Sequence, residues 1–200
     1  GKPAEPVPKL GGKKMKGYHI QFDLVFLKLK DVEKANPFFT DDPSLAKNRT
    51  PLVKGLTYIV SVVEQITGFT KLAHVATKKP RIVSPIVIRL MQNIAQELKT
   101  PLKEIEISSD SGKEFDQAML EKYVKSYKRV PTGPSIEKKN SDIQRVFFQM
   151  VRARRGKTVN KLLNLTQSIV NNNINRITGK TAAESVEQQE KKKGKKPKKY

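Results

Sequence analysis

The sequence predicts an all-α fold built from two units, each a short helix followed by a long one. Apolar residues recur at spacings of three and four through most of the chain, and this is the period of an amphipathic helix. The order short, long, short appears first, and a short-then-long pair follows it without a third helix. Because the apolar stripe of one long helix needs a partner, we expect the partial second unit to pair with the first.

The first unit is expected over residues 18–112. Its long helix has Thr50 and Pro51 at the N-cap and first position, and its last helix starts with Ser84 as N-cap and Pro85 in the first turn. The three helices are expected at residues 20–29, 51–77 and 84–94, and a brief extended segment at 102–107.

The second unit is expected over residues 141–190, after a linker or docking segment at 113–140. A short helix at 143–151 and a long helix from 159 to about 190 flank a basic loop. Outside the two units, residues 1–17 are expected to be a disordered basic N-terminal tail and residues 191–200 a Lys-rich C-terminal tail.

The charge balance points to a polyanionic partner. The chain has 40 Lys and Arg against 19 Asp and Glu, a net charge of +21. Residues 18–112 are nearly neutral, while seven of the nine residues from Lys191 to Lys199 are lysine. Since each cation that neutralises a phosphate releases a counterion, we expect the tails and basic loops to bind nucleic acid.

Other residue types exclude several classes of protein. There is no Cys, and the two histidines are His19 and His74, so disulfide scaffolds, thiol chemistry and zinc modules are excluded. No apolar stretch suits a membrane span or a signal core, which favours an intracellular or virion protein, not a secreted one. The acidic pairs lack a partnered nucleophile or a ligand set, so we expect no enzyme, no cofactor and no metal site.

Four stretches of the sequence match a known pattern: Ile20-Gln21-Phe22, Arg49-Thr50-Pro51-Leu52, Lys78-Lys79-Pro80-Arg81-Ile82, and Val159-Asn160-Lys161 through Arg176-Ile177-Thr178-Gly179. They resemble the core histone family. Residues 18–112 are similar to histone two-A, and residues 141–185 resemble a truncated histone two-B, in the manner of the fused histone doublets of large DNA viruses.

The resemblance implies a DNA-packaging protein. It would form a two-A/two-B-type pair within a nucleosome-like particle, bind double-stranded DNA without sequence preference, and join histone three/four-like proteins in the nucleus or in a virion. Arginines in loops would enter the minor groove and lysines would hold phosphates. The expected DNA-binding residues are Arg49, Lys78, Lys79, Arg81, Arg152, Arg154, Arg155, Lys157 and Lys161.

Two other functions fit the sequence. A histone-fold subunit of a transcription factor could use the same pair to present a base-reading element. A basic RNA- or ribosome-binding protein would be explained by charge and Lys-rich tails alone.

Overall fold

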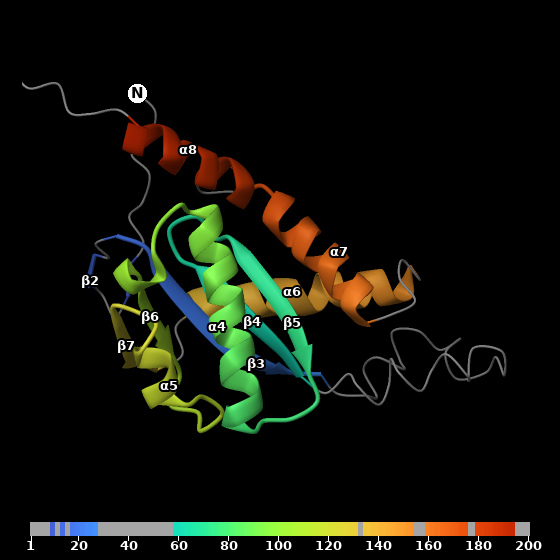
Figure 1. The fold of residues 1–200 in the computed structure, drawn as a ribbon. Helices are drawn as coiled ribbons and strands as arrows, with labels where there is room; N and C mark the ends of the chain where they lie inside the picture. The colour runs from blue at the N-terminus through green and yellow to red at the C-terminus, as the bar shows by residue number, and fades with distance from the viewer. Residues whose placement is uncertain are drawn as a thin grey trace, which may run out of the picture.

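A five-stranded mixed β-sheet forms the centre of this protein, and helices cover both of its faces (Figure 1). The computed structural model describes residues 9–10, 13–14, 17–27, 58–131, 134–153, 159–175 and 179–194. The predicted all-α fold of two histone-like units is therefore wrong, because the chain is an α/β protein.

The elements follow one another in a mixed order along the chain. The strands are β1 (Lys9–Leu10), β2 (Lys13–Lys14), β3 (His19–Phe26), β4 (Tyr58–Glu64), β5 (Thr70–Val75), β6 (Glu106–Ser109) and β7 (Ser126–Arg129). The helices are α4 (Pro80–Glu97), the 3-10 turn η1 (Leu102–Glu104), α5 (Gln117–Glu121), α6 (Pro134–Arg152), α7 (Val159–Asn172) and α8 (Ala182–Gly194). Strands β1 and β2 pair only with each other.

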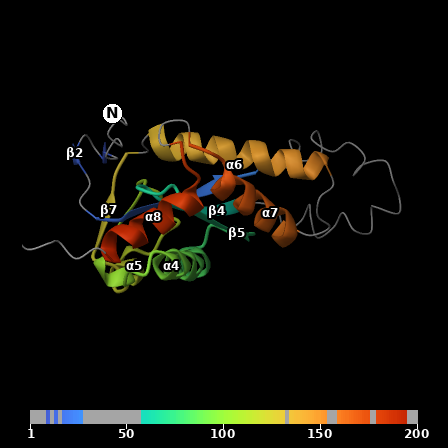
Figure 2. The same ribbon diagram turned by 90° about the horizontal axis from the view of Figure 1, so that it is seen from above.

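Strand β3 is the middle strand of the sheet, whose order is β5-β4-β3-β6-β7. It runs antiparallel to β4 and parallel to β6, and β7 continues the parallel half. Helix α4 covers one face, and α6 and α7 cover the other, as the view from above shows (Figure 2). The sheet is thus the middle layer of three.

The helix expected at 20–29 is wrong because the side chains of this segment alternate between two faces. Ile20 and Phe22 pack in the cluster under α4, while Val25 and Leu27 pack in the cluster under α6 and α7. Residues that alternate in this way belong to a strand. Apolar residues occur on both faces of this strand. Taken together along the sequence, they happen to be three and four positions apart, as in a helix.

The long helix expected at 51–77 is also wrong, and its described part forms β4 and β5. Strand β4 is buried on both faces, and such a strand is a continuous apolar run with no clear period. The turn to β5 contains Gly68 at φ +71°, a conformation that favours glycine. The buried Glu64 carboxylate fastens this turn by accepting hydrogen bonds from the Ile66 and Thr67 amides and from the Thr67 hydroxyl.

The later helices agree better with the sequence. The helix expected from Ser84 exists but begins at Pro80, and the helix expected at 143–151 is the second half of α6. The long helix expected over 159–190 is two helices, α7 and α8. No helix within the described residues is long and apolar enough to cross a lipid bilayer.

Helix α7 is fixed to the edge strand β5 by two side-chain amides one helical turn apart. The Gln167 side chain accepts a hydrogen bond from the Leu72 amide at 2.9 Å. Asn171 accepts from the Thr70 amide at 2.8 Å and donates to the Thr70 carbonyl at 2.9 Å. These bonds satisfy backbone groups that an edge strand otherwise leaves unpaired.

We expect Asn171→Ala to lower the free energy of unfolding by about 2–4 kcal/mol, because both buried backbone groups of Thr70 would lose their partner. Urea denaturation measures this change. Asn172→Ala is the control, since the exposed Asn172 side chain bonds only within its own helix, to Ser168. Equal losses in the two variants would contradict the edge-strand role.

His19 links β3 to β6 and makes stability depend on pH. Its ring nitrogen Nε2 lies 2.9 Å from the Ser108 hydroxyl, and the side chain is 3% exposed. Burial lowers the His19 pKa to about 4, against a smaller raising effect of Glu106 and together with a lowering effect of Lys128. Folding therefore keeps the ring neutral at pH values where the unfolded chain binds a proton.

The contribution of neutral His19 is complete above about pH 6.5 and is lost as the pH falls toward 4, by about 3 kcal/mol. We expect His19→Gln to unfold with a weaker pH dependence than the wild type in this window. Chemical denaturation at a series of pH values measures the difference. His74→Gln is the control, and an unchanged pH profile in His19→Gln would contradict the assignment.

Candidate functional site

Asp23 is the acidic residue on the central strand, and it faces helix α6. It occupies an odd position of β3 and is half-buried. Its Oδ1 accepts a hydrogen bond from the Leu24 amide at 2.7 Å, and its Oδ2 accepts one from the Asn140 side chain of α6 at 2.8 Å. Strand and helix together thus fix the orientation of this carboxylate.

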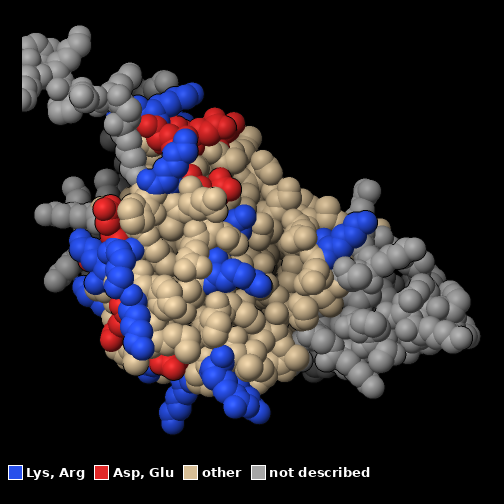
Figure 3. Space-filling view, viewed as in Figure 1, with Lys and Arg blue, Asp and Glu red and all other residues tan. Residues whose placement is uncertain are grey.

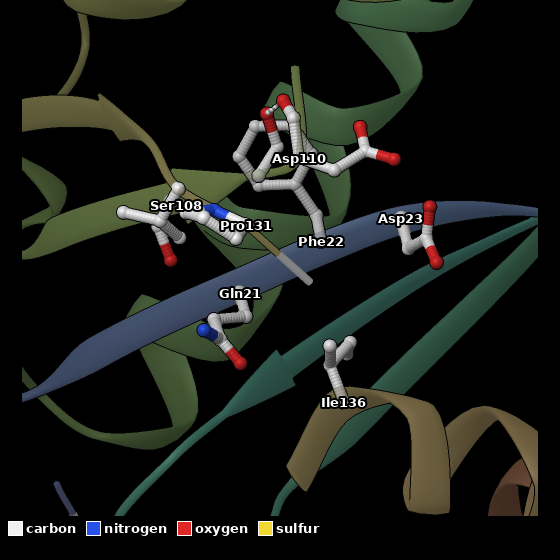
Figure 4. A pocket seen from close by; sticks show the side chains of 9 residues that line it. Gln21, Phe22, Asp23, Ser108, Asp110, Pro131 and Ile136 are labelled. Atoms are coloured by element: carbon white, nitrogen blue, oxygen red, sulfur yellow. Dashed lines mark hydrogen bonds between the residues drawn. The ribbon is translucent and has the colours of Figure 1, made fainter. Parts of the chain in front are cut away.

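Asp110 lies next to Asp23 because of the parallel pairing of β3 and β6. The register places Ser108 opposite Gln21, so two residues further along Asp110 comes beside Asp23. Both carboxyl groups lie at the same end of the pocket in Figure 4, and the Gln21 side chain points away from them. The Asp110 Oδ1 accepts a hydrogen bond from the Gly112 amide at 2.9 Å.

Glu114 brings a further carboxylate to the loop after β6. A Cβ atom on Gly112 would lie 2.0 Å from the Glu114 Oε2 and 2.9 Å from the Asp110 Oδ1. These two oxygens are therefore within about 5 Å of each other. Glycine at position 112 is what permits this approach, since any side chain there would displace one carboxylate.

The electrostatics of the site disfavour an ionised Asp23. Burial raises its pKa most, and the charges of Asp110 and Glu114 raise it further. Hydrogen bonds from the Leu24 amide and from Asn140 act in the opposite direction. Within the described part of the chain, no cationic side chain is among the groups that shift this pKa. Neighbouring carboxylates without a counter-charge are the arrangement that a bound cation stabilises.

Two neighbours of Asp23 carry buried oxygen atoms without partners. Asn140 Oδ1 and Ser61 Oγ have no hydrogen-bond partner among the described residues. Ser61 stands opposite Asp23 in the pairing of β3 with β4. A buried oxygen without a donor is unusual, and a water molecule or an ion is its common explanation.

This set of donors fits Mg²⁺, the cation that is held by one or two carboxylates and completes its shell with water and phosphate oxygens. Asp23 and Asp110 are the two carboxylates. The described residues contain no group of three or more His, Cys, Asp or Glu side chains that already converge on one point. The site is therefore a pair of neighbouring carboxylates, of which Asp23 is hydrogen-bonded to the Asn140 side chain of α6.

The predicted DNA-binding residues lie elsewhere. Lys78, Lys79 and Arg81 are exposed where β5 connects to α4, and the Lys78 ammonium lies 5.4 Å from the centre of the Tyr58 ring. Figure 3 shows that Lys and Arg side chains occur in several groups around the α4 face, with Asp and Glu among them. The structure brings this cluster of three together, and its binding of DNA stays a prediction.

The remaining predicted residues are spread over the C-terminal half. Lys161 is exposed on α7, and Arg152 is the last residue of α6. Four others lie outside the described residues: Arg49, Arg154, Arg155 and Lys157.

Sequence reasoning missed the carboxylate pair, although a signal was present. The alternation of Ile20, Phe22 and Leu24 with polar Gln21 and Asp23 is typical of a half-polar strand, but the same apolar residues also fit a helical spacing. Asp110 directly follows the strand Glu106–Ser109, and an acidic residue just after a buried strand is a frequent position for a ligand. Asn140 carried no such signal, because it fell within an expected linker.

The comparisons with known proteins give a fold but no family. Neither a protein-family model nor a curated protein matches the sequence. Among the solved structures that match is the integrase catalytic core domain of HTLV-2, in complex with magnesium and in a trimeric form. The match has a TM-score of 0.55 at 14% identity and covers 83% of this chain and 93% of that chain.

This likeness, at low identity, shows the fold alone. The chain has the α/β fold of an integrase catalytic core, so the histone resemblance and the DNA-packaging function drawn from it are wrong. The two alternative functions gain no support from it. The neighbour is itself a catalytic core domain, so it gives no support to the prediction that this chain is not an enzyme. Histone three/four-like partners and a nucleosome-like particle gain no support from this neighbour.

Proposed function

We propose that this chain is a magnesium-dependent domain that transfers phosphoryl groups of DNA, by hydrolysis or strand transfer, with Asp23 and Asp110 as the metal-holding residues. The observation that carries the proposal is that Asp23, on β3, and Asp110, directly after the adjacent parallel strand β6, line the same pocket. An integrase core bound to magnesium, which shares this fold, supports the same chemistry.

Magnesium would polarise a phosphate oxygen and stabilise the negative charge that develops on the phosphate during the reaction. The protein supplies the rest. Asp23 and Asp110 would hold the ion, and the hydrogen bonds from Leu24 and Asn140 keep the Asp23 carboxylate in one orientation. The Gly112 amide does the same for Asp110.

In this proposal, basic residues outside the carboxylate site bind the DNA. The net charge of +21 attracts a phosphate backbone at long range. Lys78, Lys79 and Arg81 are exposed together and contact phosphates without reading bases. A DNA-containing compartment is the location that this function implies.

We expect the protein to cleave or join labelled DNA in Mg²⁺ and to be inactive in EDTA. Asp23→Asn and Asp110→Asn should each lose at least 100-fold in rate, because the ion would lose one of its two charged ligands. Gel analysis of the products measures the rate. Asp142→Asn is the matched control, since Asp142 is on α6 but pairs with Arg145 and is 44% exposed. Equal activity of the wild type and the two site variants would refute the proposal.

We also expect Lys78→Ala/Lys79→Ala/Arg81→Ala to bind duplex DNA more weakly without any change of sequence preference. Each lost phosphate contact reduces the slope of log Kd against log salt concentration by about 0.9, so the triple variant should lose about 2–3. Fluorescence anisotropy at several salt concentrations measures the slope. An unchanged slope would place the DNA on another surface.

A further inference from the structure

We propose that an aromatic and basic cluster at the end of the central strand binds an unpaired base of DNA. The cluster consists of Phe26, Tyr58, Lys78, Lys79 and Arg81. The Phe26 ring stacks on the base, and the three cations hold the phosphates on either side of it. The inference rests on the proposed function for its ligand, DNA, and adds the form of DNA that is bound: a single strand, or a duplex end whose strands have separated.

The pairing of β3 with β4 brings the two rings of the cluster together. Phe26 is the last residue of β3, Tyr58 is the first of β4, and the two are direct partners in the antiparallel register. Their ring centres lie 5.5 Å apart, with an angle of 45° between the planes. Tyr58 packs against the core under α4, whereas Phe26 is 52% exposed. The buried ring therefore supports a ring that faces solvent.

The cations beside the rings distinguish Phe26 from an ordinary exposed apolar residue, which is common on protein surfaces. The Lys78 ammonium lies 5.4 Å from the centre of the Tyr58 ring, and Lys79 and Arg81 are exposed directly after it. None of these three forms an ion pair with a described residue. Residues 65–96 contain five Lys or Arg and no Asp or Glu. The positive charge at this place is thus uncompensated, and it complements a polyanion.

An open aromatic ring next to cations fits a nucleic acid strand whose bases are unpaired. In duplex DNA the faces of the bases are hidden in the stack, so a duplex would contact the three cations through its phosphates and leave Phe26 without a partner. A single strand exposes the faces of its bases, which stack on aromatic side chains while the backbone follows basic residues. The ring and the cations together therefore favour the single strand.

The cluster lies at the same end of the sheet as the carboxylates. Asp23 is near the end of β3, and Asp110 comes directly after the parallel strand β6. Phe26 follows Asp23 by three residues, about 10 Å along the strand, and points to the other face of the sheet. Helix α4 begins at this end of the sheet, where Figure 3 shows Lys and Arg side chains. A strand bound by the cluster is thus within a few nucleotides of the carboxylates.

The test compares single-stranded and duplex DNA of about 12 nucleotides, bound by the full chain in EDTA so that metal-dependent cleavage does not contribute. Fluorescence anisotropy of a labelled strand measures the Kd. We expect Phe26→Leu to bind the single strand about tenfold more weakly and the duplex as the wild type does, because leucine keeps apolar bulk but cannot stack. Phe26→Tyr restores a ring and should bind the single strand as the wild type does.

Tyr123→Leu is the matched control, because Tyr123 is an aromatic residue outside the cluster and is 42% exposed. It should leave both affinities unchanged. Ultraviolet crosslinking of the single strand to the wild type, followed by mass spectrometry of the peptides, gives a readout that needs no variant, and crosslinks should fall on Phe26 or Tyr58. Equal single-strand affinity of the wild type and Phe26→Leu would overturn the proposal, as would crosslinks that all lie outside the cluster.

The outcomes separate this inference from the proposed function. If Phe26→Leu loses affinity for the single strand but no Mg²⁺-dependent reaction depends on Asp23, the base-binding cluster stands and the proposed function fails. If the wild type cleaves DNA through Asp23 and Asp110 while Phe26→Leu binds the single strand as the wild type does, the proposed function stands and the role of Phe26 is overturned.

Discussion

The arrangement of this protein depends on the position of β3 in the middle of the sheet. Hydrogen bonds on both sides fix its register, antiparallel to β4 and parallel to β6. Because successive side chains of a strand point to opposite faces, this register sends Phe22 into the core under α4 and Asp23 toward α6. A slip by one residue would bury the carboxylate in an apolar layer and separate it from Asp110.

Helices far along the chain complete the site, so the fold must close before the site exists. Asn140 reaches Asp23 only because α6 and α7 form one layer on the sheet, with Ile143 and Phe147 in the shared core. Asn171 in turn fastens that layer to the edge strand β5. The orientation of the Asp23 carboxylate therefore depends in part on contacts at β5, which is the edge strand on the far side of β3 from β6.

The sequence predicted those elements that have one apolar face and one polar face. Helices α4 and α6 are apolar on one side, and both were expected near their observed positions. Strands β3, β4 and β5 were not, because a buried strand with two apolar faces matches a helical spacing as well as its own. The carboxylate pair could not be found by spacing either. Asp23 and Asp110 are brought together by the pairing of β3 with β6, which a wrong assignment of β3 conceals.

The charge of the chain and the charge of the site have opposite signs, and this difference explains how the two cooperate. A net charge of +21 draws a phosphate backbone from a distance, although screening limits the effect to about 10 Å at moderate salt. Asp23 and Asp110 repel the same backbone at close range. A divalent cation held by Asp23 and Asp110 would offset their negative charge, and DNA bound by the basic surface would then approach these carboxylates with less repulsion.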